Sequence, residues 1–407
     1  MLNYFFEFIT FTFPKAGVQI GVPITIAMFL FLFALIKCQL HVISAINQIK
    51  GLSVSYVLFA CSVLLAFVIN LGSLSSFQIT AAMVVFASPL AIGIGRSMDA
   101  QKAIKILAFS LIIVGSYALI QRIAGIVATA IPGLTYTFGQ DLADKPIGFG
   151  MAISGEAQKM PSTYQNGNGV GLFYAMGIPF LLSWFPLTMK QKVLKYAAIV
   201  FGLVGLFLSG SRSIMIPFVI FLIFILMLVK NKLNDHHQLL FLAAVLFISG
   251  FGILYLIHAD SSFLQQAYAR YMQQTISDPT GAGRTLQYAS AFSQINHLTE
   301  AEFLRFLIVG LPWDEINYVE GLFYSFQMYG IFGFIGFLGI FISAIISVYK
   351  QNDLAAIGMI CVLIAFMIDG SFLYPPAVMN YFFLVGLALA PKVPVRKKHA
   401  KNFIIRF

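Results

Sequence analysis

Repeated long apolar runs limit what this chain can fold into more than any other feature of its sequence. A helix needs about 20 residues to cross the hydrocarbon core of a bilayer, and about eleven runs approach that length. Inside lipid every backbone N–H and C=O group must be paired within the protein, so such runs form helices. We therefore predict an all-α fold, a polytopic integral membrane helix bundle of about 11–12 transmembrane helices. The expected spans are 20–36, 52–71, 77–95, 104–120, 170–187, 193–208, 214–229, 239–257, 322–348, 354–372 and 377–390, with 1–13 as a short twelfth.

The charge pattern points to a membrane and not to nucleic acid. The formal net charge of +10 alone would suit a nucleic-acid-binding protein, but only 10% of the residues are charged and 59% are apolar. The lysines and arginines form short clusters between apolar runs, as they do where positive charge anchors helices at the cytoplasmic face. The three cysteines, Cys38, Cys61 and Cys361, lack the spacing of metal ligands or of a disulfide framework. We expect membrane lipid as a partner and no nucleic acid.

The distribution of basic residues predicts the orientation of the bundle. Placing the basic tail, residues 391–407, in the cytoplasm puts most lysines and arginines on that side, which satisfies the positive-inside rule. The single membrane domain, 1–407, then has two long outer loops, 132–168 and 258–319, and only short connections on the cytoplasmic side. Long loops in a compact bundle are usually functional or disordered. The basic residues expected on the outer side are Lys15, Arg122, Lys145, Lys159, Arg212, Arg270, Arg284 and Arg305.

The larger outer loop has the pattern of short helices. Thr299-Glu300-Ala301-Glu302 has the spacing of a capping box and precedes an apolar run. Leu286, Ala289, Phe292 and Ile295 recur every three residues after Arg284. We expect amphipathic helices that lie at the outer surface.

Two arginines stand where helices meet that surface. Arg212 lies in Ser209-Gly210-Ser211-Arg212-Ser213 between two spans, and a charge at the bilayer centre costs about 2.5–3.5 kcal/mol, so this turn belongs at an interface. Arg284 follows Gly281-Ala282-Gly283 and opens a predicted helix, where an arginine and free N–H groups together favour anions. The alternative for each is a surface arginine that reaches lipid headgroups.

These motifs, in this order on one face, resemble the O-antigen polymerase and ligase superfamily, the Wzy-like bacterial membrane glycosyltransferases. Members often have Asn-Pro-Asn where this chain has Asn166-Gly167-Asn168. The ligase branch has a histidine near the end of the large outer loop, but residues 317–321 contain none, which favours a polymerase. His297 or His258 keeps the ligase alternative open. The similar segments are Ser162 to Gly169, Leu208 to Ser213, Gly283-Arg284, Glu320 to Tyr324 and Met328 to Gly333.

The resemblance implies a function at the periplasmic face of the bacterial inner membrane. A polymerase of this kind joins undecaprenyl-pyrophosphate-linked oligosaccharide repeat units and works with a chain-length regulator protein. The alternatives are a ligase that transfers the glycan to lipid A core or to protein, and a transporter of lipid-linked oligosaccharide. A transporter would show ionisable residues near the middle of several spans and two related halves, and the sequence shows neither.

The chemistry of transfer assigns roles to single residues. A sugar on a polyprenyl pyrophosphate needs stabilisation of the charge that grows on the leaving group, and a base for the proton of the attacking hydroxyl. Because its planar fork pairs with phosphate oxygens, arginine suits the first role, which we assign to Arg212 and Arg284, with Arg122 as a weaker third. We assign the base to Glu320, near the outer mouth of a span, although an ion pair that only orders the loop is the alternative. Other candidates for the base are Asp314, Glu315 and Asp369.

The remaining candidates concern substrate contacts and cofactors. Asn166 and Asn168 open a span and Tyr324 lies near an interface, so we list them as contacts to pyrophosphate or sugar; a membrane-boundary position is the alternative for the tyrosine. No Asp-x-Asp pair is present to hold a metal with a nucleotide sugar, and no phosphate-binding loop or dinucleotide fingerprint occurs. We expect transfer without a metal or other cofactor.

Overall fold

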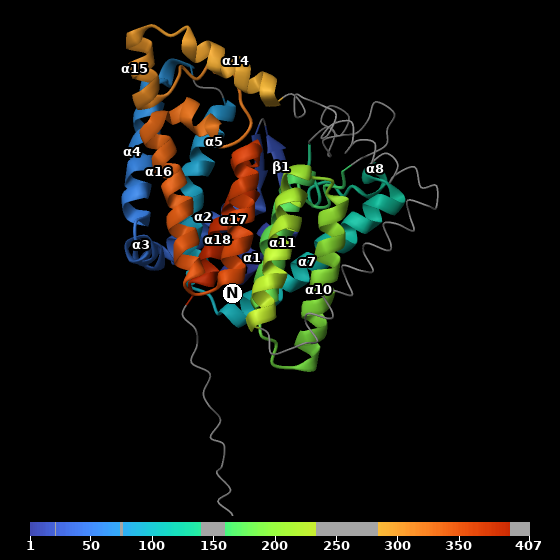
Figure 1. Ribbon diagram of the computed structural model, residues 1–407. Coiled ribbons are helices and arrows are strands. Elements are labelled where there is room, and N and C mark those ends of the chain that lie inside the picture. Colours follow the sequence, from blue (N-terminus) through green and yellow to red (C-terminus); the bar gives the residue numbers. More distant parts are fainter. Residues whose placement is uncertain (21, 74–75, 140–158, 233–283, 391–407) are drawn as a thin grey trace, which may run out of the picture.

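The computed structural model is an all-α helix bundle, and it describes residues 1–407 except 21, 74–75, 140–158, 233–283 and 391–407 (Figure 1). By length and composition, four described helices can cross a membrane, and a bent pair adds a fifth span. Five further apolar helices of 10–17 residues lie in the described part. The prediction of a polytopic membrane bundle is confirmed.

The elements follow one another along the chain with short connections. The first half contains α1 Leu2–Thr12, β1 Gly17–Ile20, β2 Val22–Thr25, α2 Ile26–Lys37, α3 Gln39–Gln48, α4 Leu52–Ile69, η1 Leu71–Ser73, α5 Ser76–Ala87, η2 Ser88–Leu90, α6 Ala91–Arg96, α7 Ala100–Ala124 and α8 Ile126–Thr129. The second half contains α9 Gly167–Ser183, α10 Met189–Leu208, α11 Arg212–Lys232, α14 Arg284–Asn296, α15 Glu300–Val309, α16 Phe323–Tyr349, α17 Asp353–Ile368, η4 Gly370–Leu373 and α18 Pro375–Ala388.

Two predicted spans differ from the helices observed. The span at 20–36 begins as a hairpin, in which β1 pairs antiparallel with β2 and Gly17 lies opposite Thr25. Helix α2 starts only at Ile26 and bends by 78° into α3, which was not predicted. The span at 77–95 is broken at η2, where Pro89 supplies no backbone N–H to continue a helix. The span at 239–257 lies outside the described residues.

The N-terminal segment forms a short buried helix and not a full span. Helix α1 packs against α2 and α7, and Glu7 in its middle is completely buried. Within the described part of the chain, neither carboxyl oxygen of Glu7 has a hydrogen-bond partner. The expectation that charged residues lie only near helix ends is therefore wrong for this residue.

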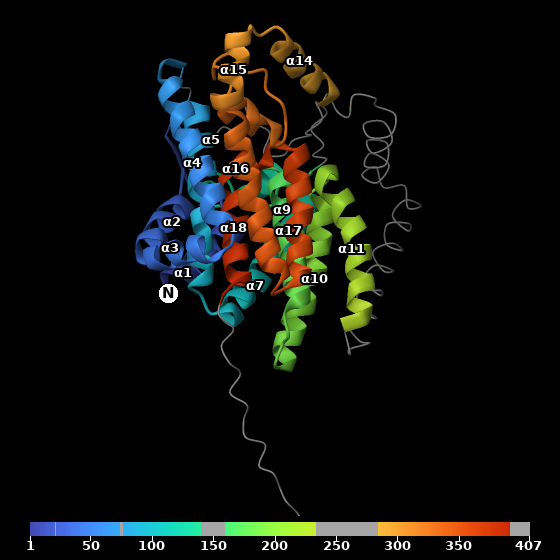
Figure 2. The same cartoon turned by 60° about the vertical axis from the view of Figure 1, so that its left-hand side comes forward.

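One end of the bundle carries most of the irregular structure. Helices α14 and α15 lie together at this end in both views, and we call it the α14 end (Figures 1 and 2). The first turns of α9, α11 and α16 are here as well, which the contacts below establish. The amphipathic helices predicted in the large loop are present, and the capping box is confirmed: Thr299 and Glu302 bond reciprocally at the start of α15. These bonds lower the pKa of Glu302.

Close helix contacts explain two glycines at the opposite end. A Cβ on Gly95 of α6 would lie 2.1 Å from the Phe383 carbonyl oxygen of α18, and one on Gly386 would lie 2.1 Å from that of Ile92. Each glycine therefore admits the backbone of the other helix, and any side chain would separate them. This contact fixes α6, which follows the break at Pro89, against the core.

Helix α16 is kinked near the α14 end. Gly330 has φ 70° and ψ −174°, a conformation that favours glycine, and the backbone of Ile308 packs against it. A kink removes helical partners from the carbonyls that precede it. Here the Leu311 N–H donates to the Gln327 carbonyl at 2.7 Å and the Trp313 indole N–H donates to the Met328 carbonyl at 3.0 Å. The segment before α16 thus satisfies the kink.

A buried lysine ends α9. Lys195 of α10 is only 1% exposed, and its ammonium group donates to the carbonyls of Leu182 at 3.0 Å and Trp184 at 2.8 Å. A cation at a helix C-terminus satisfies carbonyls that lack helical partners and opposes the helix dipole. The sequence had placed Lys195 only among the basic residues of the cytoplasmic side.

We predict that Lys195→Met destabilises the protein, because two buried carbonyls lose their donor at a cost of about 2 kcal/mol. The apparent Tm in detergent should fall by about 5 °C. The control is Lys192→Met, since Lys192 is exposed on the same helix three residues earlier. Equal Tm values for the two variants would contradict this role of Lys195.

Candidate functional site

The first turn of α9 packs directly on the turn between α10 and α11. Asn166 caps α9, with its Oδ1 atom accepting from the Gly169 N–H at 2.8 Å. A Cβ on Gly167 would lie 2.2 Å from the Ser209 carbonyl oxygen, so only glycine permits this approach. Two segments that are far apart in the sequence, each predicted to be functional, are therefore neighbours in space.

The α10–α11 turn places Arg212 at the start of a helix. Gly210 has φ 59°, which lets the chain turn back, and the buried Ser209 hydroxyl donates to the Leu206 carbonyl at 2.6 Å. Arg212 is half-buried and is the first residue of α11. The Cβ of the preceding Ser211 is in contact distance of Gly171 in α9.

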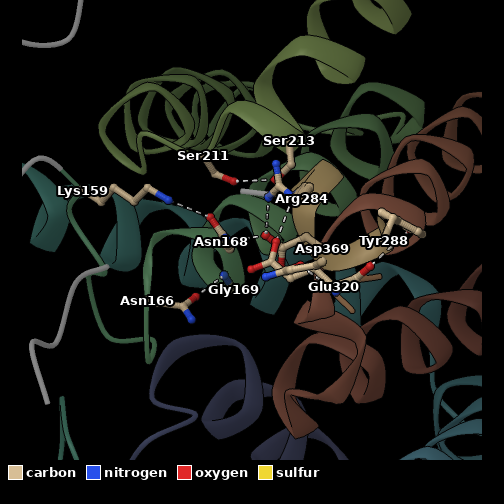
Figure 3. Close-up of polar contacts among 11 residues, drawn as sticks. Lys159, Asn166, Asn168, Gly169, Ser211, Ser213, Arg284, Tyr288, Glu320 and Asp369 are labelled. Atoms are coloured by element: carbon tan, nitrogen blue, oxygen red, sulfur yellow. Dashed lines mark hydrogen bonds and ion pairs between the residues drawn. The ribbon is translucent and has the colours of Figure 1, made fainter. Parts of the chain in front are cut away.

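Arg284 and Glu320 form an ion pair at this end of the bundle. Arg284 Nε lies 2.8 Å from Glu320 Oε2, and Arg284 Nη2 lies 3.7 Å from Asp369 Oδ2. The first two side chains are about one third exposed (30% and 33%), whereas Asp369 is 8% exposed. Figure 3 shows the guanidinium group pointing to both carboxylates. Arg284 and Glu320, which were assigned separately from the sequence, are thus direct partners.

The backbone around Glu320 explains why it lies beside Asp369. Gly321 has φ 94°, and a Cβ there would lie 2.2 Å from the Met367 carbonyl oxygen, so the segment docks closely on the end of α17. The Leu322 N–H donates to the Phe366 carbonyl at 2.9 Å. Because Asp369 is the C-cap residue of α17, this docking brings the two carboxylates to one place.

Helix α14 holds Glu320 with three residues of its first turns. Besides the Arg284 pair, the Glu320 N–H donates to Gln287 Oε1 at 3.2 Å, and the Tyr288 hydroxyl donates to the Glu320 carbonyl at 3.4 Å. Positions i, i+3 and i+4 lie on one face of a helix. The pKa of Tyr288 is raised, first by burial and then by the Glu320 carboxylate, while Arg284 lowers it.

A chain of polar side chains continues from Asp369 into α9. Asn168 Nδ2 donates to Asp369 Oδ2, and Asn168 Oδ1 accepts from Lys159 Nζ at 3.2 Å (Figure 3). We call Lys159, Asn168, Asp369, Arg284 and Glu320 the polar chain. It joins the loop before α9, the first turn of α9, the end of α17, the start of α14 and the segment before α16.

The structure places the other predicted residues less centrally. Arg122 is exposed in the last turn of α7, and Asp314 and Glu315 are exposed before α16. Tyr324 is buried, and its ring lies 5.0 Å from that of Tyr318. Of the two alternative histidines, His297 is exposed just after α14, and His258 lies outside the described residues, as do residues 281–283.

Sequence analysis missed two residues that build the loop before α9. The buried amide of Gln121 donates to the Ser162 carbonyl at 3.0 Å and accepts from the Ser162 N–H at 2.7 Å. Ser162 has φ 53°, the one positive value among the described residues other than glycine. The available signal was a glutamine near the end of a long apolar run, but the neighbouring Arg122 received the assignment. Lys159 also received no role.

The described residues contain no cluster of three or more His, Cys, Asp or Glu side chains placed to hold a metal ion. Comparisons with protein families and with characterised proteins find no match to this chain. The function must therefore be argued from the polar chain and its position at the end of a membrane bundle.

We predict that Gln121→Ala loosens the loop before α9, because the Ser162 backbone loses both partners. Local opening should become easier by about 2 kcal/mol, which is roughly a 30-fold faster exchange of the Ser162 amide hydrogen. Hydrogen–deuterium exchange by mass spectrometry on a peptide that covers Ser162 measures this. Gln191→Ala is the control, since that side chain bonds the exposed Leu187 N–H elsewhere. Unchanged exchange at Ser162 would refute the clamp.

Proposed function

We propose that the protein is a membrane glycosyltransferase that polymerises surface polysaccharide at the periplasmic face of the bacterial inner membrane. It would join undecaprenyl-pyrophosphate-linked oligosaccharide repeat units. The observation that carries this proposal is the contact of Arg284 with Glu320, 2.8 Å apart, beside the buried Asp369 at one end of an apolar bundle. An anion-binding cation and a candidate base thus lie where a lipid-linked substrate can reach them.

The reaction assigns one role to each partner. The hydroxyl oxygen of one repeat unit attacks the anomeric carbon of the sugar on a second carrier. The bond between that carbon and the pyrophosphate oxygen breaks, and its electron pair leaves with the pyrophosphate. Glu320 accepts the hydroxyl proton, and Arg284 with Arg212 stabilises the charge on the leaving group.

In the structure without substrate, carboxylates occupy the guanidinium of Arg284. A guanidinium group has five N–H donors in a fixed plane, so Arg284 can bind pyrophosphate oxygens while it keeps one carboxylate, or exchange one for the other. Exchange would free Glu320 at the moment when the donor is bound. This would couple binding of the leaving group to the availability of the base.

The orientation in the membrane is part of the proposal. With the C-terminus in the cytoplasm, α14 and the polar chain face the periplasm, where lipid-linked repeat units are polymerised. Membrane lipid and a chain-length regulator protein are the proposed partners. A ligase of the same superfamily remains the alternative, and it is separated from a polymerase by the product that accumulates in cells.

We predict that Arg284→Ala and Glu320→Gln each lower polymerisation by at least about 100-fold, as expected for loss of an electrostatic or acid–base group. The matched controls are Arg305→Ala, an arginine at the same end that bonds Asn70, and Glu315→Gln, an exposed carboxylate. The measurement is the length distribution of surface polysaccharide, with membrane abundance checked for every variant. We expect lipid core capped by single repeat units in the two site variants and long chains in the controls.

Other outcomes of that experiment have definite meanings. An uncapped core with long chains on the lipid carrier would identify a ligase instead of a polymerase. Long surface polymer in both site variants would contradict the assignment of Arg284 and Glu320.

We predict that the purified protein keeps its activity when chelator removes divalent metal, because arginine replaces a metal at the pyrophosphate in this proposal. The assay is polymer formation from lipid-linked repeat units in EDTA, with and without added Mg²⁺ or Mn²⁺. A loss in EDTA that either metal restores would argue against an arginine clamp that works alone.

A further inference from the structure

The formal charges of the ion-pair group raise a difficulty for anion binding. Arg284 contributes one positive charge, while Glu320 and Asp369 contribute two negative charges, so this group has a formal net charge of −1. A pyrophosphate carries more than one negative charge and would be repelled by such a group. Arg212 alone brings the total only to zero. A pyrophosphate site here needs another cation.

Lys159 stands in the right place to supply that charge. Its ammonium group lies 3.2 Å from the Asn168 side-chain oxygen, and the nitrogen of the same amide bonds Asp369. One amide group therefore separates the lysine from the carboxylate that contacts Arg284. Figure 3 shows Lys159 extending toward Asn168 from the side opposite Arg284.

The backbone and the stem of Lys159 are held in position. The N–H of the next residue, the buried Met160, donates to the Leu208 carbonyl at the end of α10 at 2.9 Å. A Cβ on Gly167 would lie 3.1 Å from Lys159 Cβ and 3.2 Å from Lys159 Cδ, so the lysine stem runs along this glycine. The ammonium group is thus delivered to the first turn of α9 by packing.

We propose that Lys159 is a pyrophosphate-binding residue of this site and that Asn168 is the residue that positions it. Asn168 bonds to a cation with its oxygen and to a carboxylate with its nitrogen, so its amide orientation is defined by both neighbours. With Lys159 and Arg212 included, the formal charge of the site becomes +1. The proposal rests on the proposed function, since it adds a ligand contact to the same site.

Binding of a diphosphate without turnover tests the proposal. The full-length protein in nanodiscs is titrated with farnesyl diphosphate and, separately, with inorganic pyrophosphate, both in EDTA, by isothermal titration calorimetry. The first probe represents a lipid-linked diphosphate and the second a free one. The variants are Lys159→Gln, Lys159→Arg, Asn168→Ala, the double variant Lys159→Gln/Asn168→Ala and Arg284→Gln. Lys190→Gln, an exposed lysine at the first turn of α10, is the control.

We expect Lys159→Gln to raise the Kd at least tenfold for whichever diphosphate the wild type binds, and Lys159→Arg and Lys190→Gln to stay within threefold of wild type. If Asn168 acts through Lys159, the double variant should bind no more weakly than the weaker of the two single variants. Rescue by arginine separates a charge contact from a merely structural role. Apparent Tm values check that each variant is folded.

The opposing results are distinct. If Arg284→Gln weakens binding and Lys159→Gln does not, the role of Lys159 is wrong and the proposed function stands. If the Asn168 and Lys159 effects multiply, Asn168 does not act through the lysine. If the wild type binds neither diphosphate, the proposed function itself fails.

Discussion

The buried carboxylate of Asp369 is the interaction on which the α14 end depends. An ionised group withdrawn from water is costly unless hydrogen bonds and an opposite charge surround it. Asp369 obtains them from Asn168 in α9 and Arg284 in α14, which are distant in the sequence. The carboxylate therefore requires that the end of α17, the start of α9 and the start of α14 come together. The assembly of this end and the assembly of the candidate site are the same event.

Pairing of backbone groups supplies the rest of the order at that end. Segments between membrane helices expose N–H and C=O groups that have no helical partner. Side chains satisfy several of them here: Gln121 pairs with both backbone groups of Ser162, and the Trp313 indole pairs with a carbonyl at the kink of α16. These contacts fix the loop before α9 and the segment before α16. Lys159 and Glu320, at the two ends of the polar chain, are each carried by one of these segments.

The sequence predicted the class of fold and much of the site, because both depend on strong local signals. Apolar runs indicated membrane helices, and the Thr299–Glu302 spacing indicated a helix start that the structure contains. Arg284 and Glu320 were each selected for their chemistry, but nothing in the sequence states that they touch. That contact follows from the docking of Gly321 on the end of α17, a tertiary approach that one chain without homologues does not reveal. Lys159 was missed for the same reason, since its role appears only through Asn168. The hairpin was hidden because its residues, Val18 to Thr25, continue into the apolar run of α2.

The kink at Gly330 also bears on how the protein matches the thickness of its membrane. A straight helix from Phe323 to Tyr349 would be about 40 Å long, well beyond a hydrocarbon core of about 30 Å. The part after the kink, about 19 residues, is about 28 Å long and fits that core without tilt. The two turns before the kink are attached to α15 and not to the lipid-matched rod. Hydrophobic mismatch in a thicker or thinner bilayer would therefore be absorbed below Gly330, and the depth of Glu320 relative to the headgroups would change little.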